Sequence, residues 1–216
     1  MSDRFDLVIF DNDGVLVDSE PVANRVLAGL LTEYGVPTTV EGSMAQFMGR
    51  SIPQVRAIVE ERLGRPLPGD LEARYVGELY PSFSTFLKPI PGVVEALAAI
   101  RLPVCVASSG THERIRLTLT CTGLWERFGG RVFSAQDVAR GKPAPDLFLH
   151  AAAAMGADPR RCAVVEDSPA GITAANAAGM TAFGFSGLLP PEALAHATGA
   201  VFSSMAELPA LLGHPR

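Results

Sequence analysis

Six short runs of apolar residues recur along the chain, and they constrain its fold more than any other feature. The runs are rich in Val and Phe, and several are apolar at consecutive positions instead of at every second position. Continuous apolar runs of this length are typical of strands that are buried on both faces of a parallel sheet. We predict strands at residues 7–10, 104–107, 131–133, 162–165, 181–185 and 200–202.

Helical segments lie between several of these runs, and the order of the two kinds of segment predicts the fold class. Apolar residues recur at helical spacing over residues 93–100, 145–155 and 169–178. Alternation of strands with helices is the pattern of a sheet that has helices on both faces. We therefore expect an α/β fold with a doubly wound, Rossmann-like parallel sheet.

One interval breaks this alternation, because residues from about 20 to 80 contain no strand signal. Its clearest segments, 22–34 and 53–63, are amphipathic, and a passage with Pro81, Pro89 and Pro91 closes it. We therefore predict a helical domain inserted after the first strand. The predicted boundaries are residues 18–83 for the helical domain and residues 1–17 with 84–216 for the α/β core.

Charge and cysteine content exclude several classes of function. The formal net charge is −5, and no run of Lys and Arg exceeds two residues, whereas a nucleic-acid partner usually requires a basic stripe. No apolar run approaches the roughly 20 residues of a membrane span, and the N-terminus lacks the pattern of a secretory signal. The three cysteines, Cys105, Cys121 and Cys162, are widely spaced and suggest neither a disulfide framework nor a zinc site. We expect a cytoplasmic protein with no nucleic-acid or membrane partner.

Two carboxylates, Asp11 and Asp13, follow the first predicted strand. In open α/β sheets ligands bind beyond the carboxyl ends of the strands, so this position is a candidate site. Carboxylates that lie close together need a cation or a shared proton, and Gly14 provides a turn that brings them together. The alternative is an Asp side chain that only closes a turn.

Hydroxyl and ammonium groups follow further along the chain. Ser108 and Ser109 end the second predicted strand, just before a helix that begins near His112, and such a helix start is an anion site. The alternative for these serines is an ordinary helix cap. Lys142 stands between Gly141 and Pro143 on a stiff loop, where it could neutralise a phosphoryl group or restrain an aspartate. The alternative for Lys142 is a solvated surface side chain.

A second acidic pair, Glu166 and Asp167, follows the fourth predicted strand. Ser168 and Pro169 have the pattern of a helix cap and a first helical residue, which leaves the two acids at the end of the strand. Carboxylate oxygens without His or Cys suit Mg²⁺ better than zinc. The alternative is that the acids only complement the dipole of the helix.

In this order and placement, the motifs resemble the haloacid dehalogenase (HAD) superfamily. The match is to its phosphatase and β-phosphoglucomutase-like branch, which carries a helical cap domain after the first motif. The matching segments are residues 11–20, the apolar run that ends at Ser108, residues 142–146 and residues 166–171. The resemblance spans the chain from Phe5 to about Phe185.

The resemblance implies a role for each motif residue. Asp11 matches the nucleophile that forms an aspartyl-phosphate, and Asp13 matches the general acid–base. Ser108 and Lys142 match the groups that bind the phosphoryl oxygens. The implied cofactor is Mg²⁺, with Asp11, Asp13 (through its carbonyl), Glu166 and Asp167 as the expected metal ligands.

Departures from the family pattern separate the possible activities. Dehalogenases lack an acid at the position of Asp13, so its presence favours phosphate chemistry. The mutases carry a cap His where this chain has Ala23 and a cap Arg where it has Ile52. A magnesium-dependent phosphatase is therefore the leading hypothesis, a sugar-phosphate mutase is the alternative, and a non-catalytic binding or regulatory protein is the third reading.

Substrate selection falls to the cap domain under this hypothesis. Ser19, Arg50 and Ser51 are the candidate cap residues, with Arg74 a weaker one, and each has the alternative of a solvated helix or loop position. The expected substrate is a small phosphorylated metabolite, such as a sugar or sugar-alcohol phosphate. We expect a monomer or a weak homo-oligomer.

Overall fold

The computed structural model describes residues 4–213, which divide into two compact units. Asp18–Leu87 form a helical unit, and the described residues before and after it form an α/β unit. Each unit has its own buried apolar residues.

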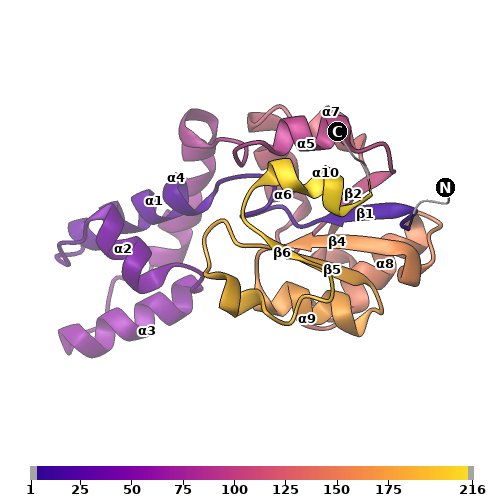
Figure 1. Cartoon of the computed structure of the whole chain (residues 1–216). Helices are drawn as coiled ribbons and strands as arrows, with labels where there is room; N and C mark the ends of the chain where they lie inside the picture. The colour runs from indigo at the N-terminus through magenta and orange to yellow at the C-terminus, as the bar shows by residue number, and fades with distance from the viewer. Residues whose placement is uncertain (1–3, 214–216) are drawn as a thin grey trace. The chain divides into compact units, whose positions relative to one another are not determined.

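A six-stranded parallel sheet forms the centre of the α/β unit, with the strand order β3-β2-β1-β4-β5-β6 (Figure 1). This sheet and its flanking helices confirm the predicted doubly wound α/β fold. Each of the six predicted runs coincides with a strand, although β2, β3 and β4 end one residue later than predicted and β3 and β6 begin one residue later. The strands are β1 (Leu7–Phe10), β2 (Val104–Ser108), β3 (Val132–Ser134), β4 (Cys162–Glu166), β5 (Thr181–Phe185) and β6 (Val201–Phe202).

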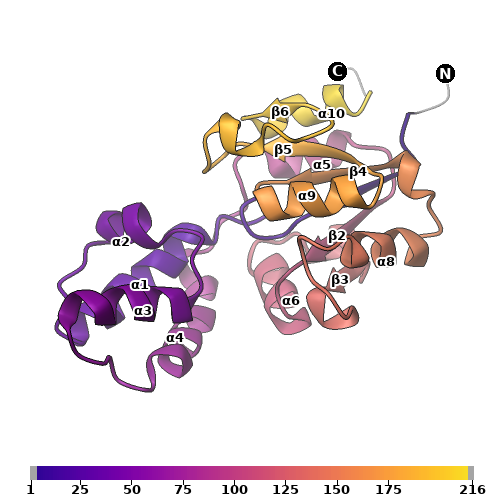
Figure 2. The ribbon, with the colours of Figure 1, turned by 90° about the horizontal axis from the view of Figure 1, so that it is seen from below.

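Helices cover both faces of this sheet (Figures 1 and 2). One face lies under α8 (Asp146–Ala154) and α9 (Pro169–Ala177), and the other under α5 (Val93–Ala99), α7 (Trp125–Phe128) and α10 (Leu208–Leu211). Helix α6 (His112–Cys121) packs beside β3. The unit also contains the short 3-10 helices η1 (Ala135–Asp137), η2 (Pro159–Arg161), η3 (Pro191–Leu194) and η4 (Met205–Glu207).

The two covered faces explain why the strand sequences are apolar at consecutive positions. In β1, Leu7 and Ile9 belong to the cluster that includes Phe148 of α8. The intervening side chains lie on the opposite face, where the ring of Phe10 meets Phe128 of α7 edge to face at 6.3 Å. Successive side chains of a strand point to opposite faces, so a strand covered on both sides has few polar positions.

Four helices make up the helical unit: α1 (Glu20–Glu33), α2 (Val40–Phe47), α3 (Ile52–Leu63) and α4 (Leu71–Phe86). Helix α1 packs against α2 and α4. A buried hydrogen bond of 2.8 Å joins Ser43 of α2 to Asn24 of α1. Arg56 of α3 donates two hydrogen bonds to Glu72 of α4, at 2.6 and 3.0 Å. These contacts join all four helices.

Pro81 does not end the helical insert, as the proline pattern predicted, but lies inside α4. A proline in a helix interior removes one backbone hydrogen bond and usually kinks or ends the helix. Here Leu79 and Phe83, on either side of Pro81, are both buried. Their burial favours continuation of the helix through the proline.

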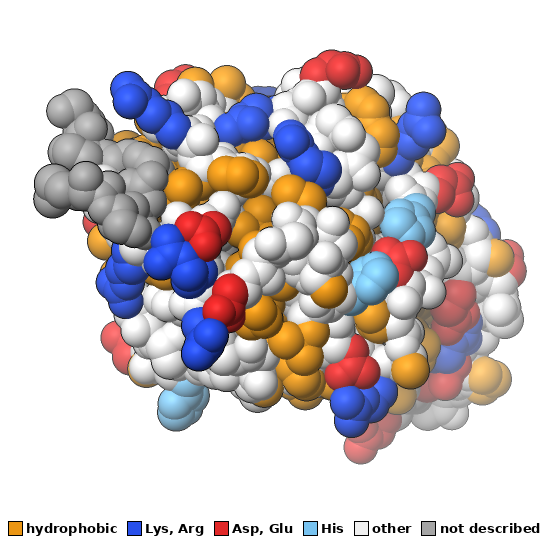
Figure 3. Space-filling model, turned by 90° about the vertical axis from the view of Figure 1, so that its right-hand side faces the viewer, with side chains coloured by type: hydrophobic (Ala, Val, Ile, Leu, Met, Phe, Trp, Pro, Cys, Tyr) orange, Lys and Arg blue, Asp and Glu red, His pale blue; other side chains and the backbone are white. Residues whose placement is uncertain are grey.

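The surface charges and the positions of the cysteines agree with what the sequence predicted. On the face drawn in Figure 3, positive and negative side chains are interspersed and not gathered by sign. Cys105 and Cys162 are buried in strands, as expected, and the three cysteines are free. Within residues 4–213, the helices are all too short or too polar to cross a membrane.

The sheet register gathers the candidate residues at one edge. Phe10, the last residue of β1, pairs with Val106 of β2 and with Val165 of β4, so the three strands end within two residues of one another. Asp11 follows directly after Phe10, and its backbone N–H continues the ladder by donating to the carbonyl of Val165 at 3.0 Å. The residues that follow these strands therefore lie at one carboxyl edge of the sheet.

Candidate active site

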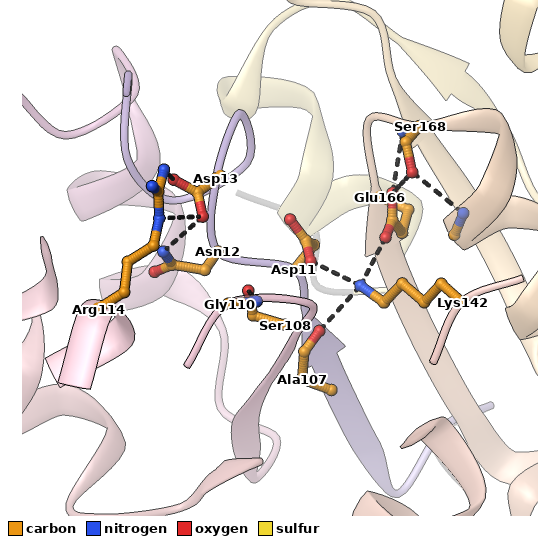
Figure 4. Close-up of polar contacts among 11 residues, drawn as sticks. Asp11, Asn12, Asp13, Ala107, Ser108, Gly110, Arg114, Lys142, Glu166 and Ser168 are labelled. Atoms are coloured by element: carbon orange, nitrogen blue, oxygen red, sulfur yellow. Dashed lines mark hydrogen bonds and ion pairs between the residues drawn. The ribbon is translucent and has the colours of Figure 1, made fainter. Parts of the chain in front are cut away.

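Lys142 lies at the centre of the polar cluster at this edge (Figure 4). Its Nζ donates to Asp11 Oδ1 at 2.6 Å, to Glu166 Oε1 at 2.7 Å and to the carbonyl of Ala107 at 3.0 Å. These acceptors use all three donors of the ammonium group. The side chain is only 4% exposed, and its Nζ lies 4.8 Å from the ring centroid of Phe148. Lys142 is thus a buried restraint on Asp11 and not a solvated surface residue.

Glu166 is held on both of its oxygens. Oε1 accepts from Lys142, and Oε2 accepts from the backbone N–H of Ser168 at 2.9 Å and from its hydroxyl at 2.8 Å. The hydroxyl of Ser168 also accepts from the N–H of Gly171 at 3.0 Å, which caps α9 as predicted. A Cβ on Gly171 would lie 1.8 Å from the Glu166 carboxyl carbon. The glycine of this motif therefore makes room for the carboxylate.

Gly14 makes the same kind of room for Asp167. Its φ is +81°, and a Cβ there would lie 1.9 Å from Asp167 Oδ2. The N–H of Gly14 donates to the carbonyl of Val17 at 2.9 Å, which closes the turn after β1. This turn brings the segment of Asp11 and Asp13 against the end of β4.

Burial and mutual repulsion dominate the electrostatics of the cluster. Burial raises the pKa of Asp11 to about 7, against the opposing attraction of Lys142 and with a further rise from Glu166. Burial and the charges of Asp11 and Glu166 raise the pKa of Asp167 to about 9. Burial opposes the charge of Lys142, but Asp11 and Glu166 raise the pKa of its ammonium above the ordinary value. Three carboxylates thus face one ammonium group, which leaves an excess of acidic groups.

This excess and the donor chemistry fit a magnesium ion. Asp11 and Asp167 offer carboxylate oxygens, and a divalent cation beside them would offset the burial and the mutual repulsion that raise their pKa values. In the described part of the chain, no group of three or more His, Cys, Asp or Glu side chains is arranged to hold a metal. Mg²⁺ keeps several waters and binds through one or two carboxylates plus substrate phosphate, so it does not require such a group.

Ser108 is the last residue of β2, and Ser109 begins the loop that leads to α6. Ser108 is 2% exposed, and its Oγ accepts from the N–H of Gly110 at 3.1 Å, whereas Ser109 is exposed. Neither serine caps α6, because the cap is Thr111, which accepts from the N–H of Arg114 at 3.2 Å. The cap alternative is therefore wrong for both residues, and they remain available to an anion at this edge.

The end of β3 and η1 both hydrogen-bond to this loop, contacts that the sequence did not suggest. The hydroxyl of Ser134 donates to the carbonyl of Gly110 at 2.6 Å. Two residues further on, Gln136 accepts from the backbone N–H of His112 at 3.1 Å. The loop thus has a fixed backbone on the side of β3.

Asp13 has an arginine partner that sequence reasoning also missed. Arg114 in the first turn of α6 donates from Nη2 to Asp13 Oδ1 at 2.7 Å and from Nε to Oδ2 at 3.3 Å. A signal was present, because a residue three positions after the cap Thr111 lies in the helix turn nearest this edge. Lys142 thus holds Asp11 and Glu166, whereas Arg114 holds Asp13.

The candidate substrate residues Ser19, Arg50 and Ser51 belong to the helical unit. Ser19 is buried just before α1, and its carbonyl accepts from the N–H of Ala23 at 2.9 Å. Arg50 is exposed and donates from Nε to the carbonyl of Gln46 at 3.1 Å. Ser51 precedes α3, and its N–H donates to the side chain of Gln54 at 2.9 Å. The contacts of Arg50 and Ser51 are those of residues at the ends of helices.

Comparison with known proteins gives matches over nearly the whole chain. The family model of the haloacid dehalogenase-like hydrolases matches residues 5–179. The 6-phosphogluconate phosphatase of Escherichia coli K12 is 32% identical over 209 residues, which are 96% of this chain and 95% of that protein.

Two solved structures are similar in sequence and in fold. A haloacid dehalogenase-like protein of unknown function from Agrobacterium tumefaciens is 40% identical, with a TM-score of 0.87 over 97% of this chain and 98% of that one. A HAD family hydrolase from Deinococcus radiodurans, solved with bound phosphate and sodium, is 33% identical, with a TM-score of 0.85 over 98% of this chain and 96% of that one.

Proposed function

The chain belongs to the haloacid dehalogenase-like hydrolases, and from that premise we propose that it hydrolyses a small phosphorylated metabolite through a magnesium-dependent aspartyl-phosphate mechanism. Its activity is that of a phosphatase. The observation that carries the proposal is the fixed carboxylate of Asp11, which Lys142 holds at 2.6 Å where β1 ends.

In the first half-reaction Asp11 acts as the nucleophile. One of its carboxylate oxygens forms a bond to phosphorus while the bond from phosphorus to the ester oxygen breaks. Asp13 gives a proton to the departing alkoxide, which leaves as an alcohol. Ser108 and Ser109 bind the phosphoryl oxygens, while Lys142, whose three donors are occupied, adds its positive charge and keeps Asp11 in place.

In the second half-reaction Asp13 acts as a base. It takes a proton from a water molecule, the water oxygen attacks phosphorus, and the bond to Asp11 breaks to release inorganic phosphate. Glu166 holds Lys142 throughout, because its two oxygens are occupied by Lys142 and Ser168.

Asp11, Asp167 and the backbone carbonyl of Asp13 are the residues that we propose to hold Mg²⁺, with Glu166 bound through water. When bound, the ion neutralises the phosphoryl charge that the acidic groups of this edge would otherwise repel.

A sugar or sugar-alcohol phosphate is the substrate class we propose. The similarity to the 6-phosphogluconate phosphatase supports this class. Ala23 and Ile52, which replace the cap His and Arg of the mutases, favour hydrolysis over transfer within a sugar phosphate. Ser19, Arg50 and Ser51 are proposed to contribute to substrate selection from the helical unit.

A panel of phosphate esters tests the proposal, with release of inorganic phosphate as the readout. The panel contains sugar phosphates, sugar-alcohol phosphates, 6-phosphogluconate and p-nitrophenyl phosphate, each with Mg²⁺ and with a chelator in its place. We expect turnover only with the metal, and no isomerisation of glucose 1-phosphate. A wild-type protein that releases phosphate from no ester in the panel contradicts the proposed function.

The nucleophile is tested by Asp11→Asn, which removes the charge but little volume. We expect a loss of activity of at least about 10³-fold with an unchanged circular dichroism spectrum. Asp6→Asn is the matched control, because Asp6 lies just before β1 and pairs with Arg161 in an exposed ion pair. That control should retain activity, and substantial activity of the Asp11 variant would exclude the mechanism.

A further inference from the structure

The carboxylate of Asp13 is turned toward α6 and held there by a fork of two hydrogen bonds. Arg114 donates from Nη2 and Nε to the two carboxylate oxygens, at 2.7 and 3.3 Å. The side chains of Arg114 and Asp13 are 23% and 29% exposed, so the pair is partly shielded from water. Two-point contact between guanidinium and carboxylate fixes orientation as well as distance.

Asn12 binds the same segment to the same helix. Its Nδ2 donates to Thr118 Oγ1 at 3.1 Å and contacts Asp13 Oδ2 at 3.4 Å. Thr118 is buried, and its hydroxyl donates to the carbonyl of Ile115 at 3.1 Å, so it accepts from Asn12. The Oδ1 atom of Asn12 is buried without a hydrogen-bond partner among the described residues. The Asn12 amide is thus oriented by its donor side, and its hydrogen bond to Thr118 anchors the turn to α6.

The two carboxylates of the motif are therefore drawn apart. Lys142 holds the carboxylate of Asp11, while Arg114 and Asn12 hold that of Asp13 on the α6 side (Figure 4). A general acid has to reach the ester oxygen on the phosphorus that Asp11 attacks. In the orientation that the structure shows, both Asp13 oxygens already accept hydrogen bonds from α6 or from Asn12.

We propose that Arg114 is a positioning residue that holds the acid–base Asp13 in a resting orientation, from which Asp13 is released for catalysis. This inference rests on the proposed function, which makes Asp13 the acid–base. Release breaks the fork to Arg114 and turns the Asp13 side chain toward the leaving group. The free energy needed to break the fork slows only those steps in which Asp13 transfers a proton. The leaving group of an aryl phosphate needs little protonation, so its ester cleavage is largely unaffected by the fork.

Substitution of Arg114 by Met tests the inference through the leaving group. The measured quantity is the ratio of single-turnover rates of ester cleavage for a sugar phosphate and for p-nitrophenyl phosphate. We expect the ratio to rise about fivefold in Arg114→Met, equivalent to about 1 kcal/mol. Arg116→Met is the matched control, because Arg116 lies on the same helix and its guanidinium stacks on Trp125 at 5.3 Å. Its ratio should equal that of the wild type.

Two further variants separate positioning from general destabilisation. Arg114→Lys keeps the charge but loses the fork, so its ratio should lie between those of the wild type and Arg114→Met. In an Asp13→Asn background, Arg114→Met should no longer change the ratio, because the residue it positions is gone. A change in that background, or an unchanged or lowered ratio in both single variants, would overturn the inference. If the wild type cleaved neither the sugar phosphate nor p-nitrophenyl phosphate, that result would instead count against the proposed function.

Discussion

At Gly171 the Glu166 carboxylate occupies the space that any side chain would need. In Gly171→Ala the new Cβ would lie 1.8 Å from the Glu166 carboxyl carbon, so Glu166 or the helix start has to move. We expect a loss of unfolding free energy of about 1–3 kcal/mol, since overpacking of a tight site costs this much. Because Glu166 holds Lys142, phosphate release should fall as well. Urea unfolding and the phosphate assay measure the two effects.

Gly29→Ala is the matched control for that substitution. Gly29 lies in α1 with open space around its Cβ position, so alanine there should leave activity unchanged. It should raise the unfolding free energy by about 0.5–1 kcal/mol, as expected for glycine in a helix interior. Equal behaviour of the two variants would show that the contact with Glu166 does not constrain residue 171.

Lys142 is the ammonium group that Asp11 and Glu166 share at the sheet edge. Lys142→Met leaves Asp11 and Glu166 without their shared partner, and removal of one member of a buried ion pair costs about 3–5 kcal/mol. Adding Glu166→Gln removes one uncompensated charge, so the double variant should regain part of the stability but none of the activity. Chemical unfolding and phosphate release distinguish these effects.

An exposed ion pair supplies the comparison for Lys142. Arg140 pairs with Asp146 at 2.8 Å, but its side chain is 71% exposed. Arg140→Met should therefore change the unfolding free energy by less than about 1 kcal/mol. If Lys142→Met cost no more than this control, the buried network would not contribute to stability.

At the scale of elements, the end of β3 supports the loop between β2 and α6 through Ser134. In Ser134→Ala the carbonyl of Gly110 loses a hydroxyl donor at 2.6 Å, and the buried site loses about 1–2 kcal/mol of stability. The loop backbone also loses its restraint. We expect the inhibition constant for inorganic phosphate to rise several-fold, as measured by competition with p-nitrophenyl phosphate.

Ser186 offers a matched hydroxyl elsewhere on the sheet. Its Oγ donates to the carbonyl of Phe202 at 3.1 Å, next to β5 and β6. Ser186→Ala should lower stability to a similar or smaller extent without changing the inhibition constant for phosphate. A parallel rise in both variants would point to a general loosening of the α/β unit, and not to the loop.

The contrast between Lys142 and Arg114 shows how far the sequence predicts the site. The candidates Asp11, Ser108 and Glu166 were found because each stands at the end of an apolar strand, and parallel strands place such ends at one edge. The contact of Arg114 with Asp13 depends on how α6 packs and turns. The contact of Ser134 with Gly110 likewise joins residues that are not neighbours in the sequence, 24 positions apart. The position of Arg114 in the first turn of α6 was a weak signal, whereas the contact of Ser134 has no local pattern in the sequence.

Local rules also fail where packing overrides them. Proline is the strongest helix breaker, so Pro81 was assigned to the passage that ends the insert, yet α4 continues through it. Burial of Leu79 and Phe83 on the two sides of Pro81 is a tertiary effect that residue propensities do not contain. The continuous apolar strands, by contrast, depend only on double burial, and all six were predicted.

At the scale of the whole molecule, the segment that leaves the α/β unit before the helical insert lies beside the segment that returns after it. Val17 and Pro89 form an antiparallel bridge, and the N–H of Ile90 donates to the carbonyl of Leu16 at 3.0 Å. Residues Val15, Leu16 and Val17 are fully buried. The two segments that flank the insert are therefore joined by hydrogen bonds within the α/β unit itself.

This closure predicts that the α/β unit folds without the insert. In the deletion variant two glycines join Val17 to Lys88 in place of the helical unit. They have to span only the short distance across the bridge. The shorter loop also lowers the entropic cost of closing the chain. We expect one cooperative unfolding transition and retained hydrolysis of p-nitrophenyl phosphate with Mg²⁺. Discrimination among sugar phosphates should be lost, because the proposed selecting residues belong to the deleted unit. Circular dichroism, thermal unfolding and the ester panel check these outcomes. A deletion variant without a cooperative unfolding transition would show that the sheet depends on the helical unit for its stability.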